Sequence, residues 1–278
     1  MHLFVTDLKF MSEDVGGSGL WGWCRFERWE KVVIEEERVV YQVHKVLRMW
    51  VGDVIAIQPW LKIEWSDDSK IWREVMRYQI RLEEFSKKRL VGEVLACEKK
   101  DSSVAKNHVT MLLAMPNHSK KMSLIVQKLT EVGVDEVVFR WSQYSQLSID
   151  GDIWMKHINK WKEKLWKVAL EAMEQSKGWV IPQVNFVSDL LWWMGWRGDD
   201  ALVIFDKVEN DVGLIDSLSS LTRWWWRSVC WCIGPEWGFG LRDWEIFSWV
   251  AFEKISLGES ILRMETAAIV GGWVLKQM

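Results

Sequence analysis

The chain has 278 residues, of which 49% are hydrophobic and 27% charged, and its formal net charge is −3. This composition is typical of a globular protein with one large domain or two smaller ones, and the charge argues against a protein that binds nucleic acid by electrostatics alone. No apolar run reaches the roughly 18 residues of a membrane helix, and the start lacks the pattern of a signal peptide, so we expect a cytoplasmic protein.

Tryptophan is unusually frequent, with 23 residues. Many stand beside Asp, Ser or Gly in segments that read as turns, such as QPWLKIEWSDDS and TRWWWRS, although a large apolar ring suits cores and interfaces. We hypothesise that some of these positions carry Gly, Asn or another polar residue in a natural sequence. An intact mass that matches 23 tryptophans would refute this hypothesis.

The amino-terminal part of the chain carries short strand-like runs, namely LFVTD, KVVIE, VIAIQ and RLVGEVLACE. Between them, residues 41–49 have the apolar spacing of a short amphipathic helix, with His44, Lys45 and Arg48 on or near its polar side. A turn at residues 51–53 leads into the next strand. The pattern favours a small β-rich domain, which the polar stretch 99–108 then links to the rest of the chain.

A basic run extends from Lys70 to Arg89 and contains three glutamates. Such a run is either a solvated face or a local patch for an anionic partner. The four cysteines give no zinc site, because only Cys230 and Cys232 are close together and such a site usually needs two close ligand pairs. In a strand these two thiols lie on the same face, so we expect buried, reduced cysteines.

The second half of the chain alternates strand and helix patterns. Strands are predicted at 109–115, 134–139, 201–206 and 228–234, helices from Ser119 and at 153–176, 241–250 and 265–276, and a further extended segment at 254–258. This alternation predicts an α/β domain with a mostly parallel sheet covered by helices.

The common nucleotide-binding and hydrolase motifs are absent from the sequence, including GxxxxGK[ST], GxGxxG, GxSxG and HExxH. Two loops remain after buried strands, at 234–240 and 257–266. Glycines in both allow close backbone approach, and the helices that follow offer unpaired N–H groups. The two loops either cradle a nucleotide-like ligand or are ordinary strand–helix turns.

The same two loops, IGPEWGFG and SLGESILRMETAA, resemble the paired motifs of the RsmE family of 16S ribosomal RNA uridine methyltransferases, which belong to the knotted SPOUT class. HKVLRMWVGDVI, MSLIVQKLTEVGVDEVVF and EAMEQS also resemble family segments, in the family's order and over nearly the whole chain. The resemblance implies a PUA-like β-barrel that binds RNA at residues 1–104 and, at 105–278, a SPOUT α/β methyltransferase domain with a parallel sheet and a trefoil knot.

The resemblance further implies S-adenosylmethionine as cofactor, 16S rRNA or the small ribosomal subunit as partner, a homodimer, and no role for a metal or a membrane. The implied product is 3-methyluridine. The residues that would contact the cofactor are Phe205, Asp206, Ile233, Gly234, Pro235, Glu236, Trp237, Gly238, Leu257, Gly258, Ile261 and Leu262, and those that would contact RNA phosphates are His44, Lys45 and Arg48.

Uridine N3 is a poor nucleophile until its proton leaves, and negative charge then spreads onto O2 and O4. Arg263 is the candidate to stabilise that charge, and Glu236 or Glu265 is the candidate to accept the proton. Either carboxylate could instead brace a loop by hydrogen bonding.

The chain departs from the family pattern at several positions. Trp237 stands where the family has glycine, and its side chain could block the cofactor pocket. A family arginine is replaced near Tyr144, and another corresponds to Gly178, with Lys177 as a substitute. Two alternatives therefore stay open: a SPOUT enzyme with another target, such as transfer RNA, and a non-catalytic RNA-binding relative.

Overall fold

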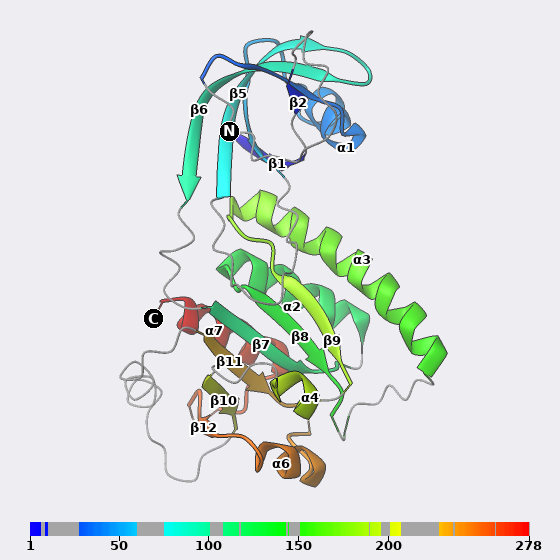
Figure 1. Cartoon of the computed structure of the whole chain (residues 1–278), viewed down its shortest axis with the longest axis vertical. Helices are drawn as coiled ribbons and strands as arrows, with labels where there is room; N and C mark the ends of the chain where they lie inside the picture. Colours follow the sequence, from blue (N-terminus) through cyan, green and yellow to red (C-terminus); the bar gives the residue numbers. More distant parts are fainter. Residues whose placement is uncertain are drawn as a thin grey trace. The chain divides into compact units, whose positions relative to one another are not determined.

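The computed structural model describes residues 1–6, 9–10, 28–59, 75–100, 108–116, 118–142, 144, 151–188, 190–195, 201–206, 228–235, 237–258 and 260–277. The chain divides into two compact units, Met1–Val104 and Ala105–Met278, and each has its own six-stranded sheet (Figure 1). None of the helices in these ranges is long and apolar enough to cross a membrane. Both Cys24 and the glycine-rich stretch 16–20, which the sequence favours as a loop, lie outside the described residues.

The first unit is a curled sheet with the strand order β1-β4-β5-β6-β3-β2 (Figure 1). Its elements are β1 (His2–Val5), β2 (Lys9–Phe10), β3 (Lys31–Ile34), α1 (Glu37–Tyr41), the π-helix η1 (Gln42–Val46), β4 (Val54–Gln58), β5 (Val75–Phe85) and β6 (Leu90–Lys100). All neighbouring strands are antiparallel except β1 and β4. The apolar side chains of α1 and the sheet form one core around Val39, Val43, Ile55 and Ile80.

Sequence reasoning missed strand β5, which forms part of the basic run from Lys70 to Arg89. Within β5, Arg77 is buried and donates to Gln58 Oε1 at 3.2 Å, while Arg81 pairs with Glu93 on β6. The interpretation of this run as a single solvated face or basic patch is therefore wrong for β5, because its arginines find partners on neighbouring strands. Lys70 and Arg73 lie outside the described residues.

The second unit is an α/β layer whose sheet is parallel throughout, with the order β12-β10-β11-β7-β8-β9. Its elements are β7 (His108–Ala114), α2 (Ser119–Val132), β8 (Glu136–Arg140), α3 (Gly151–Ser176), β9 (Gln183–Val187), α4 (Leu190–Gly195), β10 (Ala201–Phe205), β11 (Ser228–Ile233), α6 (Leu241–Phe247), β12 (Phe252–Ile255) and α7 (Met264–Gln277). The predicted α/β class with a parallel sheet is confirmed. The knot stays a prediction, since part of its path, 207–227, lies outside the described residues.

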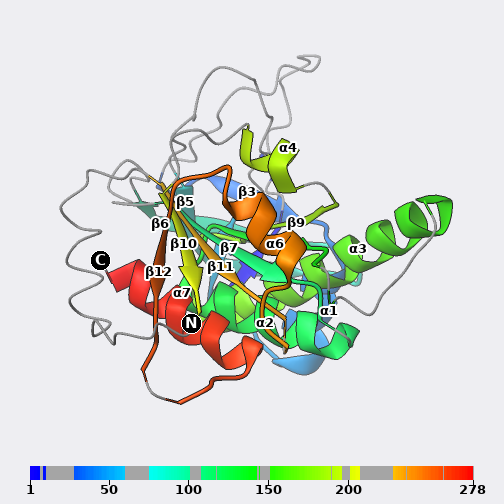
Figure 2. The same ribbon diagram turned by 90° about the horizontal axis from the view of Figure 1, so that it is seen from below.

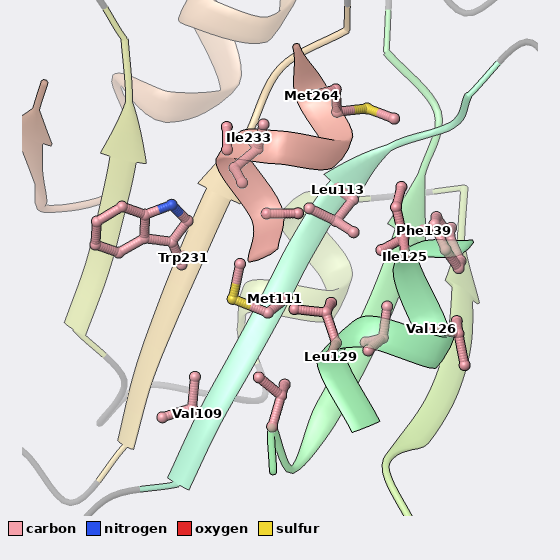
Figure 3. Packing of buried hydrophobic residues seen from close by; sticks show 14 of the residues in the cluster. Val109, Met111, Leu113, Ile125, Val126, Leu129, Phe139, Trp231, Ile233 and Met264 are labelled. Atoms are coloured by element: carbon pink, nitrogen blue, oxygen red, sulfur yellow. The ribbon is translucent and has the colours of Figure 1, made fainter. Parts of the chain in front are cut away.

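The strands of this sheet are buried on both faces, as expected for parallel strands covered by helices. Alternate residues such as Met111 and Trp231 pack with α2, α3 and α7 in one core. Figure 3 shows Val109, Met111 and Leu113 of β7 beside the apolar side chains of α2. The other residues, among them Cys230 and Cys232, face α4 and α6. Figure 2 shows these two groups of helices on opposite sides of the sheet.

Candidate functional site

The carboxyl ends of β12, β10 and β11 meet at one edge of the parallel sheet, because the three strands are neighbours in register. Phe205, Ile233 and Ile255 end these strands, and the backbone N–H of Asp206 donates to the carbonyl of Ile255 at 3.2 Å. The two glycine loops recognised in the sequence therefore follow strands on either side of β10. Open α/β sheets bind ligands at this kind of edge.

The first loop, 234–240, closes on itself through hydrogen bonds and packing. Gly238 has a φ of +77° and donates its N–H to the carbonyl of Pro235 at 2.9 Å. Gly234 lies against the ring of Phe239, which would be 3.2 Å from an added Cβ. Glu236 lies outside the described residues.

The second loop, between Ile255 and α7, is held by one serine. Ser256 Oγ accepts the N–H of Gly258 at 3.2 Å and donates to the carbonyl of the same residue at 3.1 Å. Gly258 has a φ of +115°, in the region that favours glycine. Leu257 and Leu262 are half-buried against the core, whereas Ile261 is 91% exposed.

Open space lies next to both positive-φ glycines of these loops. No atom comes within 4 Å of a Cβ added to Gly238 or to Gly258, so a ligand can approach the backbone closely. The ring of Trp237 is 78% exposed, so it extends into solvent and does not fill the loop. The described residues therefore fit a ligand that is held mainly by backbone groups and flanking leucines.

A buried ion pair braces the end of the first loop. Arg140, the last residue of β8, donates from Nη1 to Asp243 Oδ1 at 2.9 Å, and the two side chains are 1% and 2% exposed. The other oxygen of Asp243 accepts the N–H of Gly240 at 2.9 Å and so caps α6. The Arg140 guanidinium also lies 5.6 Å from the ring of Phe239. One cation thus holds both the ring and the backbone with which the loop closes.

Sequence reasoning missed Arg140 and Asp243. A signal was present, because a charged residue ends the apolar run EVVF and charged residues are almost never fully buried unless they are paired. Burial next to this pair also raises the pKa of the Cys232 thiol to about 11, which agrees with the expectation of an unreactive core cysteine.

The candidate catalytic residues lie where the second loop enters α7. Arg263 is exposed, and its carbonyl accepts the N–H of Ala267 at 2.8 Å. Glu265 Oε2 is buried without a hydrogen bond and lies 3.9 Å from Lys121 Nζ on α2. Because α2 follows the carboxyl end of β7, these residues belong to the same edge of the sheet as the loops.

The candidate RNA-binding residues of the first unit are exposed on η1 and the following turn. His44 contacts Phe85 at the end of β5, with 6.3 Å between the ring centroids. The turn after Phe85 carries three exposed cations and is ordered by Ser86 Oγ, which accepts the N–H of Arg89 at 3.0 Å. We call this set the η1 basic surface; it consists of His44, Lys45, Arg48, Lys87, Lys88 and Arg89.

Comparison with known proteins agrees with this site. The family model for the RNA methyltransferase domain matches residues 103–275, which is more than half of the chain and includes both glycine loops. The chain belongs to the RNA methyltransferase family. This RNA methyltransferase is 28% identical over 195 residues to the Ribosomal RNA small subunit methyltransferase E of Mesomycoplasma hyopneumoniae, covering 69% of this chain and 78% of that protein.

Solved structures share the fold of this methyltransferase. A Legionella pneumophila methyltransferase in complex with the cofactor SAM superposes with a TM-score of 0.69 at 18% identity, over 99% of this chain and 96% of that chain. A Ribosomal RNA small subunit methyltransferase E from Neisseria gonorrhoeae, bound to S-adenosyl methionine, has a TM-score of 0.68 at 19% identity, over 100% and 97% of the two chains. The fold implied by the sequence resemblance is thereby confirmed.

Proposed function

We propose that this methyltransferase uses S-adenosylmethionine to form 3-methyluridine in the 16S RNA of the small ribosomal subunit, in the cytoplasm. The observation that carries the proposal is the similarity over 195 residues to a protein named for the small-subunit RNA. The open space beside Gly238 and Gly258 supports the cofactor assignment. The η1 basic surface supports a polyanionic substrate, since Lys and Arg side chains position nucleic-acid backbones without reading their sequence.

S-adenosylmethionine supplies an electrophilic methyl group, so the chain must bind it and prepare uridine N3 as the nucleophile. The loops 234–240 and 256–262 would hold the cofactor through backbone groups, with Leu257 and Leu262 as apolar walls. Phe205 and Asp206 would close the site from β10, where Asp206 is already held by Lys254 at 3.3 Å. A fixed position of the reacting atoms supplies a large part of the acceleration.

Arg263 would stabilise the negative charge that develops on O2 and O4 as N3 loses its proton. Glu265 would accept that proton, because its Oε2 is buried at this edge without a hydrogen bond, whereas Asp206 already has Lys254 as an ion-pair partner. Glu265→Gln should therefore lower kcat by about 10²–10⁴-fold with little change in the affinity for the cofactor. An equal loss of affinity and rate would instead assign Glu265 to bracing the loop.

Four exposed apolar side chains on the loops and α6 favour a homodimer, because contiguous exposed apolar surface marks interaction sites. They are Trp237, Leu241, Trp249 and Ile261, with 78%, 78%, 80% and 91% exposure. Light scattering should give twice the chain mass of 32.9 kDa. A mass of one chain would reject the dimer.

The first experiment is calorimetric titration of S-adenosylmethionine into the purified chain, with about one site per chain expected. The variants Gly238→Ala and Gly258→Ala should lose affinity, since each adds a Cβ to the open space beside a strained backbone. Gly133→Ala is the matched control: it has a φ of +83° but ends α2 away from the loops, so it should reduce stability and leave the affinity unchanged.

The second experiment identifies the substrate. Methyl transfer to small ribosomal subunits, followed by mapping of the modified nucleoside, should give 3-methyluridine. Methylation of transfer RNA in preference to the small subunit would overturn the substrate and keep the cofactor assignment. Absence of cofactor binding by the unmodified chain would overturn the enzymatic proposal itself.

A further inference from the structure

One face of helix α3 carries exposed lysines at helical spacing. Lys160, Lys164 and Lys167 follow each other at intervals of four and three residues and are all exposed, so they form one stripe on the helix surface. We call this stripe the α3 lysine face. The opposite side of the helix packs on the sheet through Ile158 and Leu165, which are 7% and 1% exposed.

The lysines of this face are largely unneutralised. Lys167 pairs with Glu163 at 2.7 Å, whereas no carboxylate of the described chain lies within ion-pair distance of Lys160 or Lys164. The acidic residues of the helix, Glu171 and Glu174, lie in its other half. Positive charge is thus concentrated in the first half of α3, although the chain as a whole has a net charge of −3.

This half of the helix extends past the carboxyl edge of the sheet. α3 has 26 residues and is about 39 Å long at a rise of 1.5 Å per residue, whereas the five-residue strand β8 spans about 17 Å. The helix ends near the start of β9, where Gln183 N–H donates to the carbonyl of Asp135. Its first half therefore projects on the side where the glycine loops lie (Figures 1 and 2).

We infer that the α3 lysine face binds the phosphate backbone of the RNA substrate, as a contact in the methyltransferase unit that is separate from the η1 basic surface. This inference rests on the proposed function. Lysine is a flexible point charge that suits phosphate groups without demanding a fixed geometry, and phosphate contacts set the position of a nucleic acid on a protein. The projecting helix half would then hold RNA that passes over the edge where methyl transfer takes place.

The test measures binding of a 16S RNA transcript by the full chain as a function of salt. The variant K160Q/K164Q should bind about tenfold or more weakly at 0.1 M salt, and the slope of log K against log salt should fall by roughly 0.7 to 0.9 for each phosphate that the variant no longer neutralises. Its affinity for S-adenosylmethionine should equal that of the unchanged chain, because the substituted side chains lie on the solvent side of α3.

The matched control is K128Q/K276Q, which removes the same charge at the amino edge of the sheet, where Lys276 pairs with Asp135. Its salt slope should stay that of the unchanged chain. An unchanged slope in K160Q/K164Q, or an equal loss in the control, would overturn the inference. These outcomes differ from failure of the proposed function, in which the unchanged chain itself would not bind the cofactor or methylate the RNA.

Discussion

Replacing Arg140 with leucine tests whether the buried ion pair organises the first glycine loop. Coulomb's law gives about 6 kcal/mol of attraction for charges 2.9 Å apart at an effective dielectric constant of about 20, and desolvation cancels much of it. The substitution, however, leaves the Asp243 carboxylate buried without its cation. We therefore expect Arg140→Leu to lower the free energy of unfolding by about 3–5 kcal/mol, a large share of the roughly 5–15 kcal/mol of a typical domain.

The double variant R140L/D243N separates the buried charge from the packing. Asparagine keeps an acceptor for the Gly240 N–H but carries no charge, so we expect the double variant to lose less than about 2 kcal/mol. Urea denaturation of both variants measures the difference. Lys167→Leu is the control, because it breaks the exposed pair with Glu163 and should not change the midpoint measurably. The reasoning is refuted if the single variant loses less than about 1 kcal/mol, or if the double variant is no more stable than the single one.

Three further predictions concern the cores and the backbone. Gly92→Ala should destabilise the first unit by about 1–3 kcal/mol in thermal unfolding, because an added Cβ would lie 2.8 Å from the carbonyl oxygen of Arg81; no loss would contradict the close packing. Trp29 has a φ of +76°, so Trp29→Gly should gain about 1 kcal/mol, whereas Trp29→Ala should gain nothing. The raised pKa of Cys232, about 11 against 9.0, means that the folded thiol keeps its proton when the unfolded one loses it. Stability should then fall by up to about 3 kcal/mol between pH 9 and 11, and Cys232→Ala should show a shallower fall.

Most of the parallel sheet could be predicted because its strands are continuous apolar runs between turn signals. The runs at β7, β8, β10 and β11 required no knowledge of their partners, since burial on both faces makes every residue apolar. Strand β5 gave no such signal. Its arginines read as solvated, and the residues that neutralise or bury them, Gln58 and Glu93, belong to strands that are distant in the sequence or separated from β5 by a turn.

The position of the site was predictable for a related reason. Parallel strands place their carboxyl ends at one edge, so two glycine loops after two such strands lie on the same side of the sheet once the order is known. The identity of the neighbours was not predictable, because β10 separates β11 from β12 in space while the chain connects them through α6. Glu265 was a candidate from its place in the motif, but its contact with Lys121 on α2 depends on the packing of two helices.

Arg140 shows why the remaining part of the site could not be read from sequence. A single arginine after an apolar strand has no local partner, and its role follows only when Asp243, 103 positions later, comes within 2.9 Å. The glycines make the loop able to approach a ligand, but glycines also increase the conformational freedom that the loop loses on folding. A loop of this kind requires rigid neighbours, and the pair of Arg140 with Asp243 supplies them from two elements of the core. Ligand approach and loop order are thus provided by different residues, of which only the first group has a recognisable motif.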